Sequence, residues 1–225
     1  MSSDPRGDVR SPEADQPAGN RPELSVATLV RARGATLLEA LERHLPDSRA
    51  HADGTASYAF ALAAELGSGR AEAELVRETA RLHEIGMVYV PASILGRAAE
   101  ELSPDELALV DSHAAYGAEL AKGAGVPTEA WEWIAATRER FDGAGPNGLA
   151  GERIPLEARI VRAACACDAL LTRGSSSDGP GVYSDVTARL RAAAGEELDP
   201  RLVEILAGIV ERASAPPPEP QQPSA

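Results

Sequence analysis

Apolar residues recur three and four positions apart along almost the whole of residues 24–213, and this spacing restricts the possible folds more than any other feature. It is the period of an α-helix that buries one face. No segment shows the alternation of apolar and polar residues that is typical of a half-buried strand. In the first helical segment the apolar positions are Leu29, Leu37, Leu38, Leu41 and Leu45. The sequence therefore predicts an all-α fold, a bundle of about seven helices.

Residues that start or stop helices divide this pattern. Ser103, Pro104 and Glu106 have the spacing of a capping box with proline at the first helical position. Aromatic residues make up only 4% of the chain, whereas alanine is abundant. Small side chains allow helices to approach closely, so this composition also favours packed helices. The predicted helices cover residues 24–45, 48–66, 71–83, 103–122, 128–140, 154–172, 184–194 and 200–213.

The length of 225 residues fits one domain with a full core. We expect a helical domain over residues 23–214. The flanking residues 1–22 and 215–225 are rich in proline and polar residues and lack apolar periodicity, so we expect disordered tails there. Residues 174–182 are expected to form a flexible loop.

Charge and hydropathy exclude several classes of partner. The net charge of −13 argues against non-specific binding to DNA or to an anionic membrane, but it leaves room for a cationic pocket that binds one phosphorylated ligand. The chain has no apolar run of about 18 residues, as a transmembrane helix needs. Its N-terminus also lacks an apolar signal core. We therefore expect a cytoplasmic protein.

Three of the four histidines lie where a bundle builds metal sites. His83 and Glu84 stand at the end of a buried helix, an arrangement that is costly unless something binds both side chains, and a metal ion is the first candidate. Two polar side chains satisfied by their neighbours are the alternative. His51 and His113 lie on the apolar faces of two other predicted helices, so the three imidazoles can converge. His44, next to a helix end, is expected to be structural.

A series of short motifs runs through residues 24–212. In order they are His51, His83-Glu84-Ile85-Gly86, Val90-Pro91, Ser103-Pro104, His113 with Gly117, Phe141-Asp142-Gly143, Gly145-Pro146, Ile154-Pro155-Leu156 and Asp168-Ala169-Leu170. This series resembles the HD-GYP subgroup of the HD-domain phosphohydrolases. The resemblance implies an all-α bundle in which histidines and aspartates hold two or three Fe or Mn ions. It also implies attack of metal-activated water on a phosphodiester, most often cyclic di-GMP.

The resemblance is incomplete at the positions that carry the chemistry. His51, His83 and His113 are retained, and Glu84 stands where the namesake aspartate is expected. Five further positions differ. Met87 replaces an expected lysine, Thr137 and Arg138 replace two adjacent histidines, Gly145 runs into Pro146 without the expected tyrosine, and Cys165 replaces an aspartate. Met87, Thr137 and Arg138 are therefore vestiges of catalytic positions.

These substitutions leave two alternatives for the metal. His51, His83, Glu84 and Cys165 still offer four ligands, a set that suits tetrahedral Zn²⁺ better than the Fe or Mn of the family. The second position keeps Glu84 and His113 only and should be empty. Alternatively no metal is bound, Arg138 pairs with Glu84 in its place, and Cys165 is a small buried apolar residue.

Three functions follow as hypotheses. The first is a degenerate domain that acts as a regulatory or protein-interaction module in cyclic di-GMP-type signalling, with little or no phosphodiesterase activity and a signalling protein or a cyclic dinucleotide as its partner. The second is a metal-dependent phosphohydrolase, either a cyclic di-GMP phosphodiesterase or a mononuclear nucleotide phosphohydrolase. The third is a non-catalytic nucleotide sensor that uses Arg138, Arg140 and Arg173.

The remaining motif residues are expected to have mainly structural roles. Asp142, Gly143 and Gly145 are expected to shape a loop, since glycine permits positive φ. Arg159 and Asp168 are expected either to form a structural ion pair or to contact a ligand.

Overall fold

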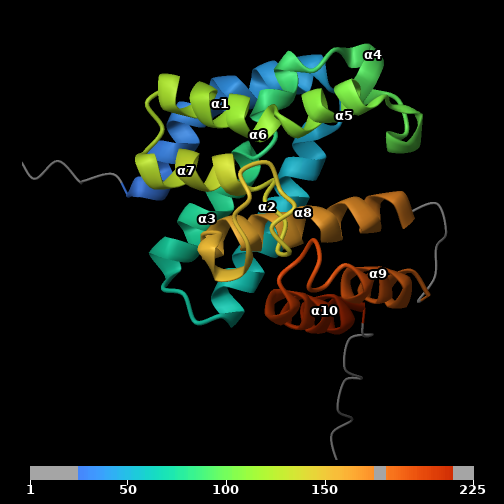
Figure 1. Cartoon of the computed structure of the whole chain (residues 1–225). Helices are drawn as coiled ribbons and strands as arrows, with labels where there is room; N and C mark the ends of the chain where they lie inside the picture. The colour runs from blue at the N-terminus through green and yellow to red at the C-terminus, as the bar shows by residue number, and fades with distance from the viewer. Residues whose placement is uncertain (1–24, 175–180, 215–225) are drawn as a thin grey trace, which may run out of the picture.

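The computed structural model describes residues 25–174 and 181–214, and all regular elements within them are helical (Figure 1). The all-α prediction is confirmed. The predicted tails, and the predicted loop except for its ends, fall outside the described residues. The α-helices are α1 (Val26–His44), α2 (Ser48–Glu65), α3 (Arg70–Leu82), α4 (Ala92–Leu95), α5 (Pro104–Asp111), α6 (His113–Gly123), α7 (Thr128–Ala136), α8 (Leu156–Gly174), α9 (Gly181–Ala192) and α10 (Pro200–Ser214). Short 3-10 helices are η1 (Ile85–Tyr89), η2 (Ala99–Glu101) and η3 (Gly151–Arg153).

The segment predicted as one helix over residues 103–122 consists of two helices, α5 and α6. The capping box at Ser103 is present, and it begins α5 where the sequence predicts. Ser112 separates the two helices, and its hydroxyl donates a hydrogen bond to the carbonyl oxygen of Leu109 at 2.6 Å. This bond competes with the regular backbone pattern, which is how serine interrupts helices. The break places His113 at the first turn of α6.

The core is built largely from small and branched aliphatic residues, as the composition predicts. One apolar cluster joins α2, α3, α8, α9 and α10, and a second joins α1, α3, α6 and α7. Helix α2 packs against both α3 and α8, and these three lie at the centre of the molecule (Figure 1). None of the described helices has the length and apolarity needed to cross a bilayer.

Two glycines allow helical elements to approach one another closely near the predicted histidine cluster. A Cβ on Gly86 in η1 would lie 1.9 Å from the carbonyl oxygen of His113, so η1 packs directly against the backbone of α6. A Cβ on Gly54 in α2 would lie 1.9 Å from Oδ1 of Asp168 in α8. Only glycine fits at either position without displacing its neighbour.

Candidate metal centre

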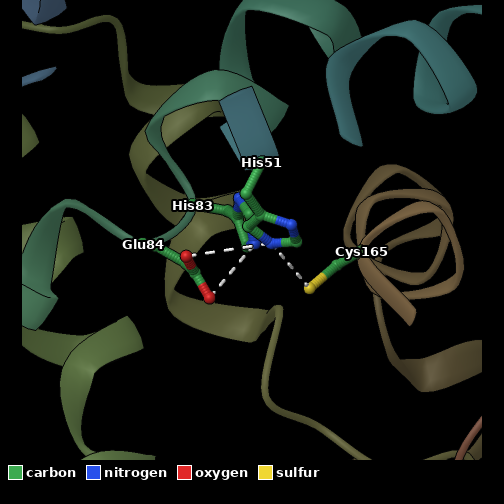
Figure 2. Close-up of side chains that lie close together, drawn as sticks. All are labelled: His51, His83, Glu84 and Cys165. Carbon is green, nitrogen blue, oxygen red and sulfur yellow. Dashed lines mark hydrogen bonds and ion pairs between the residues drawn. The ribbon is translucent and has the colours of Figure 1, made fainter. Parts of the chain in front are cut away.

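Four side chains from three helical segments meet at the centre of the bundle. His51 comes from α2, His83 and Glu84 follow the end of α3, and Cys165 comes from α8. Each offers one ligand atom, and these four atoms lie within 4.8 Å of one another. Figure 2 shows the imidazole of His51 between the carboxylate of Glu84 and the thiol of Cys165. Within the described residues His113 does not belong to this group.

Hydrogen bonds to the Nδ1 atoms orient the imidazoles. Nδ1 of His51 bonds Oδ2 of Asp168 at 2.7 Å, and Nδ1 of His83 donates to the carbonyl oxygen of Ala80 at 2.7 Å. Nδ1 of His113 donates in the same way to the carbonyl oxygen of Val110 at 2.6 Å. A proton held on Nδ1 leaves the lone pair of Nε2 free, and histidines that bind metals usually have such a partner.

The Nε2 atom of His83 is buried and has no hydrogen-bond partner. The residue is only 3% exposed, and Oε1 of Glu84 lies 3.9 Å from this nitrogen, which is too far for a hydrogen bond. A buried polar atom without a partner is costly and is rare in native proteins. The neighbouring donor set of imidazole, carboxylate and thiol is one that binds Zn²⁺ and related ions. The residues present therefore fit one metal ion.

The electrostatics of the cluster pair protonated imidazoles with anionic neighbours. Burial alone would lower the pKa of His51, but its hydrogen bond with Asp168 raises that pKa to about 11, and the neighbouring Cys165 likewise raises the pKa of His83 against burial. A metal ion that binds here would take the place of the Nε2 protons. Burial by itself would raise the pKa of Cys165, but the adjacent His83 and His51 outweigh it and lower the pKa to about 7. Burial would likewise raise the pKa of Glu84, yet the three imidazoles and Arg138 hold it below its ordinary value. The pKa of His113 falls to about 4, mainly through burial, so this imidazole is neutral near pH 7.

Thr137 and Arg138, which stand where the family resemblance implies ligands of a second metal ion, have other partners. The hydroxyl of Thr137 donates to the carbonyl oxygen of Ile134 at 2.8 Å. Nη2 of Arg138 donates to Oδ1 of Asp111, the last residue of α5. The predicted ion pair between Arg138 and Glu84 is therefore wrong. Asp111 is half exposed and reaches the guanidinium at the protein surface, whereas Glu84 already faces the imidazoles.

Arg159 and Asp168, for which the sequence left a structural ion pair and a ligand contact as alternatives, each form an ion pair but not with one another. Nη1 of Arg159 bonds Oδ2 of Asp199 at 2.5 Å, and this contact joins α8 to the start of α10. Asp168, also on α8, instead forms a hydrogen bond with Nδ1 of His51. Gly54 leaves the space into which the Asp168 carboxylate fits, which links this contact to the close approach of α2 and α8.

A cavity of about 570 Å³ opens beside the candidate metal centre, flanked by the residues on either side of His113. Three arginines line it: Arg138, Arg140 and Arg162. Arg162 was missed by the sequence analysis. It lies one helical turn before Cys165 on α8, and this spacing on an otherwise apolar run is the signal that points to it. The side chain of Arg173, at the end of α8, lies outside the described part of the structure.

Glu139, also missed, holds the loop that closes one side of the cavity. It is 1% exposed and accepts hydrogen bonds from the backbone N–H and the side-chain amide of Asn147 and from the N–H of Leu149, at 2.7–3.0 Å. A Cβ on Gly145 would lie 2.7 Å from the Cα of Glu139. Asp142 accepts from the N–H of Ala144 at 2.9 Å, and Gly143 has a φ of 87°.

Comparisons with known proteins relate this chain to a family. A family model described as the HD domain matches residues 35–202. The 3'3'-cGAMP-specific phosphodiesterase 2 of Vibrio cholerae is 33% identical over 173 residues, which cover 76% of this chain and 33% of that protein. The cyclic di-GMP phosphodiesterase response regulator RpfG of Xanthomonas campestris is 36% identical over 148 residues, which cover 64% of this chain and 39% of that protein. The chain thus spans between a third and two fifths of the length of these two relatives.

Solved structures show the same fold. Bd1817, an HDG"Y"P protein from Bdellovibrio bacteriovorus, superposes with a TM-score of 0.62 at 21% identity and covers 83% of this chain and 61% of its own. The HD domain of the phosphodiesterase PgpH from L. monocytogenes, in complex with cyclic-di-AMP, superposes with a TM-score of 0.59 at 16% identity and covers 79% of this chain and 94% of its own. With the family match over residues 35–202, the chain belongs to the HD-domain family of phosphohydrolases.

Proposed function

We propose that this chain is a single-metal HD domain that binds a cyclic dinucleotide and acts as a regulatory module, with little or no phosphodiesterase activity. The observation that carries the proposal is the buried Nε2 of His83, which lacks a partner and faces Glu84 and Cys165, next to a second metal position where Thr137 and Arg138 are engaged elsewhere. One ion fits, and the ligands for a second are missing.

Zn²⁺ is the ion that these ligands suit best. His51, His83, Glu84 and Cys165 offer two imidazole nitrogens, one carboxylate oxygen and one sulfur, and thiolate with imidazole favours Zn²⁺ over Mn²⁺. Fe or Mn is the choice that family resemblance favours. The sulfur contributes most to this preference, because it stands where the family resemblance leads us to expect a carboxylate.

The expected low activity follows from the loss of groups that would act together with that ion on the phosphate. In a two-metal site, both ions together polarise the phosphate and generate the nucleophile. Loss of a group that stabilises the transition state typically lowers the rate by about 10²–10³-fold. Here Met87 replaces the lysine expected from the resemblance, and Thr137 and Arg138 replace the two histidines, so several such groups are lost together.

Two observations support a cyclic dinucleotide as the ligand: the names of the relatives and the residues that line the cavity. The names of the relatives specify cGAMP and cyclic di-GMP, and the PgpH domain was solved with cyclic-di-AMP. In this chain the arginine-lined cavity beside the candidate metal centre is suited to the phosphates of such a ligand.

A second candidate function is hydrolysis with one ion. The complete set of His51, His83, Glu84 and Cys165 favours it, because a single bound ion supplies Lewis-acid chemistry to a phosphate ester. In that case His113, neutral and beside Glu84, is the residue placed to accept or donate a proton.

Metal analysis, binding and turnover, measured on the same preparation, separate these functions. We expect one zinc per chain, binding of cyclic di-GMP or cGAMP, and turnover of either that is not above background. Turnover that disappears in His83→Ala would contradict the regulatory proposal and support hydrolysis. Absence of any bound metal after reconstitution with Zn²⁺, Mn²⁺ and Fe²⁺ in turn would contradict both.

A further inference from the structure

Three guanidinium groups line one wall of the cavity that adjoins the candidate metal centre. Arg138 follows the end of α7, Arg140 lies two residues later, and Arg162 projects from α8. Nη1 of Arg162 lies 3.4 Å from the carbonyl oxygen of Thr137, the residue before Arg138, so α8 and the end of α7 bring these two arginines to the same place. Like charges gathered in this way repel one another unless anions lie between them.

The carboxylates that now face these arginines are at the surface. Asp111, the partner of Arg138, is 48% exposed, and Glu197, which contacts both Arg162 and Arg140, is 50% exposed. Asp142 binds Arg140 through two contacts and also caps the following loop. Surface ion pairs contribute little free energy, so Asp111 and Glu197 are partners that an incoming anion can displace.

The guanidinium of Arg162 is only partly neutralised, because it shares the carboxylate of Glu197 with Arg140. Its side chain is only 12% exposed, and two of its hydrogen bonds go to the backbone carbonyl oxygens of Thr137 and Glu197. Burial, followed by the charge of Arg138, lowers its pKa. The Nε of Arg138 is also buried and has no hydrogen-bond partner. Both groups therefore have unused capacity to bind an anion.

The cavity lies close to the candidate metal centre, although its lining includes none of the four candidate ligands. Ser112 and Ala114, on either side of His113, belong to its lining, and Arg162 lies one turn from Cys165 on the same face of α8. Among the described residues, the lining includes several alanines and no aromatic ring on which a base would stack. The lining is therefore suited to bind a phosphate group and does not offer contacts that would select among nucleotide bases.

We propose that Arg138 and Arg162 form a phosphate clamp that supplies positive charge beside the candidate metal centre, where the family resemblance leads us to expect a second ion. The clamp takes the phosphate of a nucleotide, and Asp111 leaves Arg138 when that phosphate enters. The inference deepens the proposed function, since it names the residues that hold the anion at the same site.

Isothermal titration calorimetry with cyclic di-GMP and with guanosine monophosphate tests the clamp, on full-length chain that is either zinc-loaded or stripped with EDTA. The first probe carries phosphodiesters and the second a phosphomonoester, so the two arms distinguish the sources of the phosphate. We expect at least one probe to bind both preparations. We expect Arg138→Met and Arg162→Met each to weaken that binding by about tenfold or more. Arg189→Met, at an exposed ion pair on α9, is the matched control and should bind like the wild type.

Asp111→Asn provides a second, opposite readout that does not depend on how well Arg162→Met folds. Removal of the competing carboxylate frees Arg138, so the same probe should bind several-fold more tightly. A role of this ion pair in stability alone would predict unchanged or weaker binding.

The clamp is overturned if neither probe binds the stripped protein, or if both arginine variants bind like the wild type. Zinc content, measured in parallel, should be the same in all variants. A wild-type protein that holds no zinc would contradict the proposed single-metal centre. The clamp would still be tested in that case, because the stripped preparation measures ligand binding without metal.

Discussion

At the scale of single residues, His83 is the ligand whose replacement is most informative. Its Nε2 is buried without a partner, while its Nδ1 is already fixed by the carbonyl oxygen of Ala80. We expect His83→Ala to lose bound zinc, measured by inductively coupled plasma mass spectrometry after dialysis. His44→Ala is the control, because Nε2 of His44 bonds the carbonyl oxygen of Val90 away from the cluster. Equal zinc in both variants would exclude His83 as a ligand.

Cys165 determines which metal the centre prefers. Its sulfur lies 3.6 Å from Nε2 of His51, and its lowered pKa near 7 makes the thiolate accessible at neutral pH. Cys165→Asp replaces a soft ligand by a hard one, so we expect zinc affinity to fall by about tenfold or more relative to Mn²⁺. Competition between the two ions, followed by metal analysis, measures the change. Cys167→Ala, two residues away in the apolar core, should keep the wild-type preference.

Single residues also show where sequence reasoning succeeds. His51, His83, Glu84 and Cys165 could be brought together from motif order alone, since the fold of the resembling family fixes their placement. The partner of Arg138 could not, because it depends on where α5 ends and therefore on which carboxylate lies across the cavity. An arginine side chain reaches several partners, and only three-dimensional packing selects among them.

At the scale of elements, the contact of η1 with α6 holds the candidate ligands in place. A Cβ on Gly86 would meet the carbonyl oxygen of His113 at 1.9 Å and the N–H of Gly117 at 2.5 Å, and backbone atoms cannot rotate away. We expect Gly86→Ala to lower the free energy of unfolding by about 2 kcal/mol or more, measured in urea. In α6 itself, Gly123→Ala meets no atom within 4 Å and should leave stability unchanged or slightly higher. Similar losses in the two variants would contradict this packing argument.

The elements themselves could be predicted to a large extent. Periodicity locates most of the helices, and the capping box at Ser103 locates the start of α5. The break at Ser112 could not be predicted, because it leaves the apolar period of α5 and α6 almost unchanged and depends on one side-chain hydrogen bond. The loop after α7 was recognised from its glycines, but its anchor, the buried Glu139, resembles an ordinary surface residue in sequence.

At the scale of the whole molecule, the candidate metal centre joins three helical segments that are distant in sequence. Its ligands come from α2, from the end of α3 and from α8, the helices at the centre of the bundle (Figure 1). The unfolded chain does not present these four atoms together, so a bound ion stabilises the folded state almost exclusively. The same site that would give the domain its chemistry is therefore expected to support its fold.

Zinc should consequently raise the melting temperature of the metal-free protein. With zinc about 1,000-fold above its Kd, the stabilisation is about 4 kcal/mol, which corresponds to a rise of about 10 °C for a domain of this size. Differential scanning calorimetry of EDTA-stripped protein, with and without zinc, measures this shift. His83→Ala should show little of it, because a ligand has been removed from the centre. Arg138→Met should show the full rise, since Arg138 binds Asp111 and lies outside the group of four ligands. A rise of equal size in His83→Ala would place the zinc elsewhere, and no rise in the wild type would contradict the proposed zinc centre.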